Sequence, residues 1–328
     1  MSVRLADVEP APDVFAAVMA TGILSIAAHR HRYHWVSDTL GVLATGALVL
    51  LVALVVGHAV VRKVRWDLSD PDVTLRLFTF VAACAVLDSR LASRRVVLVT
   101  LGVVAVSAWL ALAVLTARNM WIRRGPALRD EAHGAWELAS VGTSGLAIVA
   151  TQVAAHSSAH WWLGLAVPVW VAALGIYALM TWLILWRAVT ERHQHNGFDP
   201  DSWILMGGLA IATLAGDHIH ALAPDWLAPS IRVATVVTWG SATAWIPVLI
   251  YFGLQRIHRW PATLRFAGVW WAMVFPLGMY SAATDAMATE TDQRSLVTVS
   301  LVFFWIALGA WLIVAGAGSL RVVSKFAA

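Results

Sequence analysis

The sequence contains little charge and only one cysteine. Asp, Glu, Lys and Arg together make up 13% of its 328 residues, whereas 60% are hydrophobic and the mean hydropathy is +0.73. So few charges exclude an ordinary soluble domain and indicate a polytopic membrane protein. The single Cys84 lies inside an apolar run, which excludes an intramolecular disulfide and a thiolate metal cluster.

The basic residues do not form a continuous patch. A formal charge of +4 and a pI near 9.7 would be compatible with a nucleic-acid partner, but the arginines and lysines fall in short clusters between apolar runs. We therefore expect no nucleic acid and interpret these clusters as topology signals. The first residues lack a basic segment, so we expect no cleavable signal peptide and an uncleaved first span.

Ten apolar runs predict ten transmembrane helices in a single domain, residues 1–328, without a soluble domain. The odd-numbered runs are shorter or are interrupted by Gly, Ser, Thr and Pro, whereas the even-numbered runs are long and uniformly apolar. A helix of about 14 residues spans roughly 21 Å, less than the roughly 30 Å of a hydrocarbon core, so the odd helices need shelter from their neighbours. The runs cover residues 15–28, 40–61, 77–87, 96–117, 136–155, 161–186, 203–215, 233–254, 266–287 and 296–320.

This alternation predicts an all-α fold with two layers. Short loops join each odd helix to the following even helix, so we expect five helical hairpins, with the odd helices inside and the even helices outside. Such a repeated pattern favours a transporter or channel over an enzyme. Roughly two thirds of the 23 arginines and lysines lie at the termini or after even helices, which predicts a multi-pass plasma-membrane protein with both termini in the cytoplasm.

Small and hydroxylated residues concentrate on the odd runs, as in M-A-T-G-I-L-S (residues 19–25) and S-V-G-T-S-G (residues 140–145). They favour either close helix packing or a pore wall, and one helix can use opposite faces for the two roles. The predicted pore-lining residues are Ala16, Met19, Thr21, Gly22, Ser25, Gly142, Thr143, Gly208, Thr213, Pro276 and Gly278.

The ninth run contains W-W-A-M-V-F-P-L-G-M-Y-S-A-A-T, residues 270–284. A helix that only supports its neighbours rarely carries so many kink-forming and hydroxylated residues. We expect this segment to line a passage and Phe275, beside Pro276, to obstruct it.

Arginine and lysine are missing from the odd runs themselves. Tight anion binding usually requires a cation, so this absence suits weakly selective conduction better than tightly coupled transport. Asp88, Asp217 and Asp285 lie at the ends of odd runs, where we expect them near the outer face. The stretch D-H-I-H (residues 217–220) permits a metal-binding or proton-relay role, but histidines two apart do not share a helical face, so we assign no metal and no cofactor.

The segments P-D-V-F-A-A-V-M-A-T-G-I-L-S (residues 12–25) and W-W-A-M-V-F-P-L-G-M-Y-S-A-A-T together resemble the tellurite-resistance/dicarboxylate-transporter family. That family includes bacterial tellurite-resistance homologues, malate and sulfite transporters, and slow-type anion channels. The resemblance implies ten helices in five hairpins around a quasi-five-fold axis, an anion pore lined by the odd helices, and often a homotrimer. It places the pore-blocking phenylalanine of the family at Phe275 and the narrow first-helix segment at residues 16–22.

These observations lead to the hypothesis of an anion channel or uniporter with a central pore occluded by Phe275. Its substrate is a small inorganic or organic anion that the sequence does not identify. An alternative is a proton-coupled carrier for malate-like C4-dicarboxylates, or an exporter of tellurite or sulfite. A membrane enzyme or haem cytochrome is a third possibility, which the scarcity of histidines inside the spans disfavours.

Overall fold

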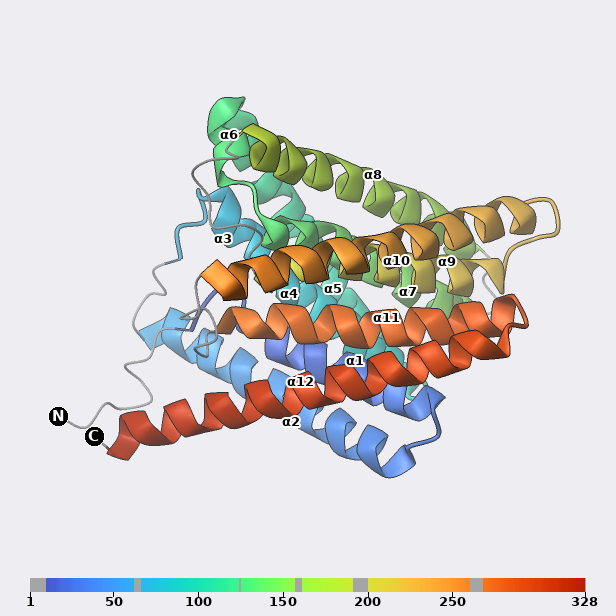
Figure 1. The fold of residues 1–328 in the computed structure, drawn as a ribbon, viewed down its shortest axis with the longest axis horizontal. Coiled ribbons are helices and arrows are strands. Elements are labelled where there is room, and N and C mark those ends of the chain that lie inside the picture. The colour runs from blue at the N-terminus through green and yellow to red at the C-terminus, as the bar shows by residue number, and fades with distance from the viewer. Residues whose placement is uncertain are drawn as a thin grey trace.

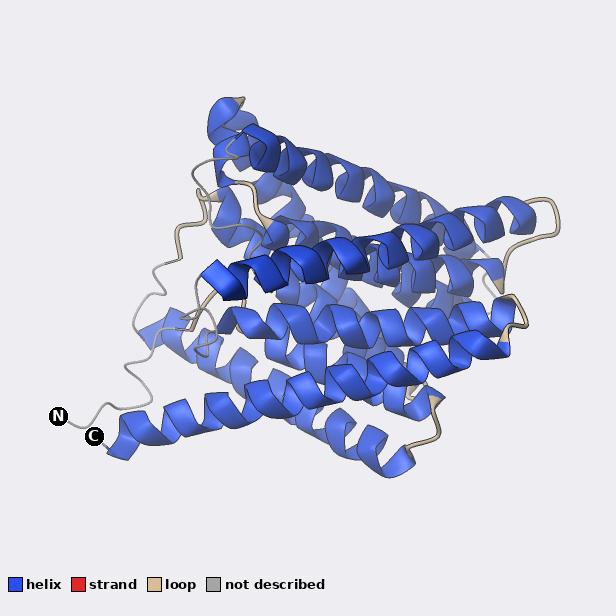
Figure 2. Cartoon of the chain, in the orientation of Figure 1, coloured by secondary structure: helices blue, strands red, loops and turns tan. Residues whose placement is uncertain are grey.

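The computed structural model describes residues 10–61, 66–123, 125–156, 161–190, 200–259 and 268–327. Within these ranges every regular element is a helix (Figure 2). Figure 1 shows the long helices side by side in one bundle, with their axes along its longest dimension. The fold is therefore all-α, as the alternation of apolar runs predicts.

Five helices form a closed inner ring. They are α1 (Ala16–Arg30), α4 (Phe78–Arg90), α7 (Leu138–His156), α9 (Ile204–His220) and α11 (Trp271–Glu290). Each packs against the next in chain order, and α11 packs against α1 to close the ring. These helices correspond to the odd-numbered runs of the sequence.

Five longer helices form the outer wall. They are α2 (His34–Val61), α5 (Arg95–Ile122), α8 (Trp161–Thr190), α10 (Ala228–Arg259) and α12 (Arg294–Ala327). Each packs against the inner helix that precedes it, which gives five hairpins. Because every outer helix returns the chain to the starting side, the five inner helices run in the same direction. We call the side on which they begin the amino end and the other side the carboxyl end.

The two layers differ in burial. In α7 every residue from Leu138 to Thr151 is buried, and in α9 every residue from Ile204 to Gly216. In α2, by contrast, only Ser37, Leu40, Gly41, Ala44 and Leu48 are buried. The outer helices thus present apolar side chains outward, as a lipid environment requires, and shelter the inner helices, which confirms the predicted layering.

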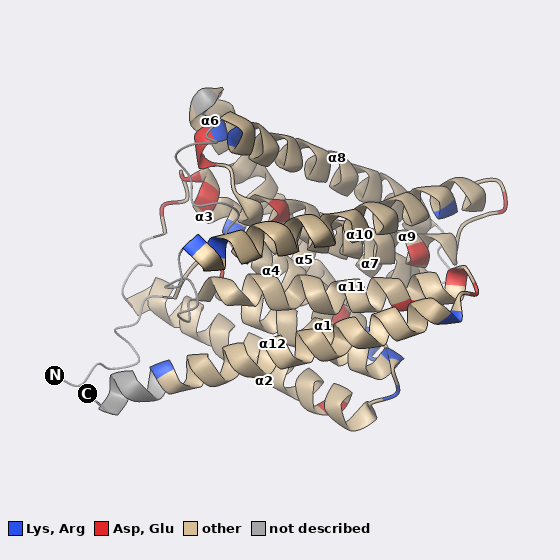
Figure 3. Cartoon of the chain, viewed as in Figure 1, with Lys and Arg blue, Asp and Glu red and all other residues tan. Residues whose placement is uncertain are grey.

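Within the described part of the chain, seven helical segments are long and apolar enough to cross a membrane by length and composition. The inner helix α1, with 15 residues, is apolar but shorter, as expected for a sheltered helix. The exact number of ten spans stays a prediction. Figure 3 shows the charged residues concentrated toward the two ends of the bundle, with long uncharged stretches between them.

Short helices precede the inner helices at the amino end. They are α3 (Pro71–Arg76) before α4, α6 (Pro126–Glu131) and η2 (Gly134–Glu137) before α7, η3 (Pro200–Trp203) before α9, and η5 (Gly268–Trp270) before α11. The start of α3 is fixed locally, because the Asp70 side chain accepts a hydrogen bond from the Asp72 backbone N–H at 3.0 Å and Pro71 occupies the first turn. These segments bring polar residues to the mouth of the ring.

Candidate functional site

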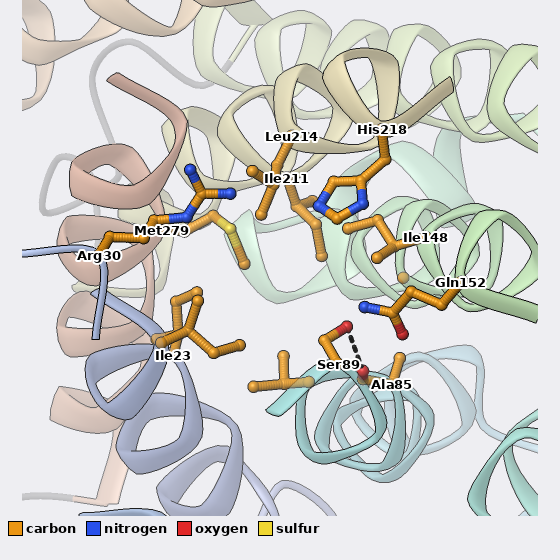
Figure 4. Close-up of a pocket in the computed structure, with 13 residues that line it drawn as sticks. Ile23, Arg30, Ala85, Ser89, Ile148, Gln152, Ile211, Leu214, His218 and Met279 are labelled. Atoms are coloured by element: carbon orange, nitrogen blue, oxygen red, sulfur yellow. Dashed lines mark hydrogen bonds between the residues drawn. The ribbon is translucent and has the colours of Figure 1, made fainter. Parts of the chain in front are cut away.

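A cavity of about 160 Å³ lies inside the ring toward its carboxyl end. All five inner helices contribute to its wall, and Figure 4 shows their side chains converging on it. At roughly 30 Å³ for each molecule of liquid water, it has room for about five waters. Its lining residues are Ile23, Ile26, Arg30, Ala85, Val86, Ser89, Gly145, Ile148, Gln152, Ile211, Leu214, His218 and Met279.

The polar side chains of this cavity come from four different helices. Arg30 lies in the last turn of α1, and its Nη1 donates to Oδ2 of Asp285 at 3.3 Å. Gln152 and His218 point into the cavity from α7 and α9 (Figure 4), and Oε1 of Gln152 is buried without a hydrogen-bond partner among the described residues. Ser89 donates to the carbonyl oxygen of Ala85 at 3.0 Å. The cavity therefore combines an apolar wall with a few polar groups, the usual composition of a small-ligand site.

A second, smaller cavity of about 20 Å³ lies at the amino end. Residues of the five inner helices or of the segments directly before them line it as well. It has room for only one or two waters. The lining residues are Asp13, Ala16, Met19, Arg76, Thr79, Ala135, Leu138, Asp201, Ile204, Gly268, Val269 and Ala272.

An ionic network borders the amino-end cavity. His133 bridges two carboxylates, with Nδ1 2.5 Å from Oδ2 of Asp201 and Nε2 2.5 Å from Oδ1 of Asp72. Arg76 forms ion pairs with Asp72 at 2.9 Å and with Asp13 at 3.5 Å. The network thus joins the segments that precede α1, α4, α7 and α9. We call these five residues the amino-end network.

Close approach of two backbone segments makes this network possible. At Gly134 an added Cβ would overlap the backbone of Asp201 and Ser202. A glycine is needed here because any side chain would push η2 away from η3. The neighbouring His133 is consequently held beside Asp201, whose Oδ2 also accepts a hydrogen bond from the Ala135 N–H at 3.1 Å.

The network alters the protonation of its members outside the spans. Burial alone would lower the pKa of His133, but its hydrogen bonds to Asp201 and Asp72 outweigh burial and raise that pKa to about 9. Burial alone would raise the pKa of Asp72, but the hydrogen bond with His133 and the charges of His133 and Arg76 lower it to about 2. At neutral pH His133 is therefore a cation between two carboxylates.

Buried residues of α11, Val274 to Gly278, lie between the positions that line the two cavities. On α11, Ala272 lines the amino-end cavity and Met279 lines the carboxyl-end cavity. Phe275 follows Ala272 by three residues and precedes Met279 by four, so it shares their helical face. Its side chain is completely buried. Pro276 packs closely against α9, because a Cβ added at Gly207 would lie 2.9 Å from its ring.

A family comparison gives this arrangement its context. The SLAC1 family, described as voltage-dependent anion channels, matches residues 10–317. The chain belongs to this family. The match spans nearly the whole sequence, so the membership applies to the complete ring and wall, and it confirms the resemblance found in the first and ninth runs.

Curated relatives are named as membrane proteins and transporters. An uncharacterized transporter of Methanocaldococcus jannaschii is 22% identical over 322 residues, covering 92% of this chain and 90% of the relative. A second from that organism is 20% identical over 189 residues, covering 56% of this chain and 54% of the relative. An uncharacterized membrane protein of Mycobacterium tuberculosis is 29% identical over 144 residues, covering 42% of this chain and 72% of the relative. Family and relatives together indicate an anion transporter or channel in a lipid membrane and point away from an enzyme.

The structure turns most of the predicted pore-lining hydroxyls toward outer helices. Thr21 accepts a hydrogen bond from Trp311 of α12 at 2.9 Å, and Thr143 accepts one from Trp109 of α5 at 2.8 Å. The hydroxyls of Thr213 and Thr238 of α10 are 2.9 Å apart. Ser25 donates to the backbone carbonyl of Ser37 in α2 at 2.7 Å. These hydroxyls therefore bind outer helices to the ring.

The other predicted pore-lining residues lie either at the amino-end cavity or at close contacts between helices. Ala16 and Met19 line the amino-end cavity, and Pro276 packs against α9 as described. The glycines lie where neighbouring side chains approach closely: Gly22 beside Val86, Gly142 beside Phe78, Gly208 beside Tyr177 of α8, and Gly278 beside Ile23. That these residues line a conducting pore stays a prediction.

Sequence reasoning missed the residues that give the two cavities their polar character. Arg30 follows the first apolar run, and the helix extends far enough to place it at the cavity. In the sequence His218 is marked only by the stretch D-H-I-H, and its neighbour His220 lies 3.4 Å from Glu290 in a separate ion pair. His133 and Gln152 gave no sequence signal, because their partners and surroundings lie far away in the chain. Among the described residues, no group of three or more His, Cys, Asp or Glu has a metal-binding arrangement.

Proposed function

We propose that this protein is an anion channel or uniporter whose pore runs through the inner ring and is closed by Phe275. The observation that carries the proposal is the pair of cavities, each lined by all five hairpins, at opposite ends of one ring. Phe275 lies on the α11 face that connects them and is fully buried. Membership in a family of voltage-dependent anion channels supports an anion as the permeating species.

The proposed gate works by excluding hydrated ions. An aromatic ring in a narrow apolar passage prevents a hydrated anion from crossing and offers it no replacement for its water ligands. Gly207 of α9 lets Pro276, the residue after Phe275, pack closely against that helix, because a Cβ at Gly207 would lie 2.9 Å from the Pro276 ring. Conduction then requires the Phe275 ring to rotate away or the helices to separate.

Replacement of Phe275 tests this proposal directly. Phe275→Ala should increase anion conductance several-fold in voltage-clamped cells or planar bilayers, because it removes the side chain that fills the passage. A matched control is Phe304→Ala, which removes an equally buried ring from the outer helix α12. The control should lose stability without gaining conductance. A folded Phe275→Ala protein with wild-type current would contradict the gate.

We further propose a plasma-membrane location, cytoplasmic termini, ten spans and a homotrimer. The distribution of arginine and lysine supports the orientation, since the positive-inside rule assigns the more basic side to the cytoplasm. In that orientation the amino-end network faces the cytoplasm and the carboxyl-end cavity faces outward. Labelling of a cysteine introduced at Asp225, between α9 and α10, by an impermeant thiol reagent on intact cells would support it. Protection there, with labelling after lysis, would reverse it.

A further inference from the structure

We propose that the carboxyl-end cavity is a binding site for a small, weakly hydrated, singly charged anion, held by Arg30, Gln152 and His218. This inference rests on the proposed function in taking an anion as the transported species. It adds a defined site, three donor residues and a selectivity. Figure 4 shows the three side chains directed at the same space from three different helices.

Arg30 supplies the positive charge at the cavity. Only its Nη1 has a hydrogen-bond partner among the described residues, namely Asp285 at 3.3 Å. A guanidinium carries five N–H donors, so several remain for a second acceptor. Hydrogen bonds from arginine to an anion are charge-assisted and stronger than those between neutral groups. Arg30 can therefore bind an anion while it stays attached to α11.

Gln152 and His218 add neutral donors on the opposite wall. Oε1 of Gln152 is buried without a partner in the part of the chain that the structure describes, and such unsatisfied groups are rare in folded proteins. The side-chain amide of Gln152 can donate a hydrogen bond to a ligand from its NH₂ group, and His218 can donate one from its ring N–H. Both side chains face the space that Arg30 also faces, so an anion in the cavity can accept hydrogen bonds from both walls.

The charged residues around the cavity favour an anion with one negative charge over an anion with two. Asp285 pairs with Arg30, and Asp217 also lies within electrostatic range of Arg30, Asp285 and Glu290. Arg232 is already paired with Glu290 at 2.9 Å. Two arginines thus face three carboxylates, so the net charge of this set is negative when the histidines are neutral. It repels a dianion about twice as strongly as a monoanion, and only close contact with Arg30 opposes that repulsion, so the site favours a single negative charge.

The apolar wall selects weakly hydrated ions. A bound ion would lose much of its hydration shell to apolar side chains that offer it no hydrogen bonds, among them Ile23, Ile148 and Ile211. Strongly hydrated anions lose more on transfer into such a site than weakly hydrated ones. We therefore expect nitrate, bromide and thiocyanate to bind more tightly than sulfate, phosphate or malate.

Equilibrium binding of radioactive chloride to the purified full-length protein tests the site. Nitrate should displace chloride at concentrations at least about tenfold below those needed for sulfate or malate, by the charge argument above. Arg30→Gln should weaken chloride binding about tenfold or more, because it removes the charge-assisted donor. Asp285→Asn should strengthen it several-fold, because it frees Arg30.

The matched control is Arg294→Gln. Arg294 is the exposed first residue of α12 at the carboxyl end, and it does not line the cavity. The Arg294→Gln protein should bind chloride like the wild type. The proposal is overturned if Arg30→Gln and Asp285→Asn both bind like the wild type, or if sulfate and malate compete as well as nitrate.

The outcome is separable from that of the proposed function, because binding is measured without conduction. If Phe275→Ala conducts while Arg30→Gln binds normally, the anion site alone is wrong. If chloride binds as expected while Phe275→Ala stays closed, the gate alone is wrong.

Discussion

The two ends of the ring are built from the same five hairpins but differ in how they use polar residues. At the amino end, His133 pairs with both Asp72 and Asp201, and the cavity beside them is only about 20 Å³. At the carboxyl end, Gln152 and His218 face a cavity of about 160 Å³. Paired buried charges fix the positions of the segments that carry them, whereas polar groups around an open cavity leave room for a ligand. The amino end therefore stabilises the ring, and the carboxyl end is left open for binding.

Removal of the central cation should have the largest effect on this contrast. His133→Ala removes the cation that contacts both Asp201 and Asp72, and leaves the buried Asp201 without its ion-pair partner, which should cost about 3–5 kcal/mol of stability. Thermal unfolding of the detergent-solubilised protein would measure the loss. His258→Ala, an exposed histidine in the last turn of α10, is the control and should change little. Equal effects of the two substitutions would remove the distinction between the two ends.

The same contrast predicts a pH dependence. The folded-state pKa of His133 is about 9, above its usual 6.5, so its contribution is complete below pH 6.5 and disappears as pH rises through 9. The pKa of Asp72 is about 2, below its usual 3.8, so its contribution is present above pH 3.8 and disappears as pH falls through 2. The stability difference between wild type and His133→Ala should therefore be greatest between pH 4 and 6.5. A difference that grows from pH 7 to pH 10 would contradict the assigned charges.

The smallest effect is expected at the carboxyl end. Gln152→Leu removes a buried, unpartnered carbonyl oxygen and fills part of the cavity with apolar atoms, so it should stabilise the protein by about 1 kcal/mol. Chloride binding should fall in the same variant. A rise in melting temperature together with weaker binding would show a site that gives up stability for function. A marked loss of stability would indicate that Gln152 supports the fold instead.

The hydroxyl groups of the inner helices show what the sequence alone could not predict. The concentration of small and hydroxylated residues on the odd runs correctly marked the inner helices. It did not reveal which face each residue occupies, because helix rotation is set by packing against both neighbours. Thr21 and Thr143 accordingly reach Trp311 and Trp109 of outer helices, 290 and 34 residues away in the chain. That Phe275 obstructs a passage between the two cavities stays a prediction.

The sequence by itself determined the membrane class, the helix layers and the family, because these depend on apolar length and on motifs that are continuous in the chain. Tertiary structure alone decided which polar groups meet. His133 lies 61 residues from Asp72 and 68 from Asp201, and Arg30 lies 255 from Asp285. Closure of the ring brings these residues together, since only the packing of five separate hairpins fixes the distance between their ends.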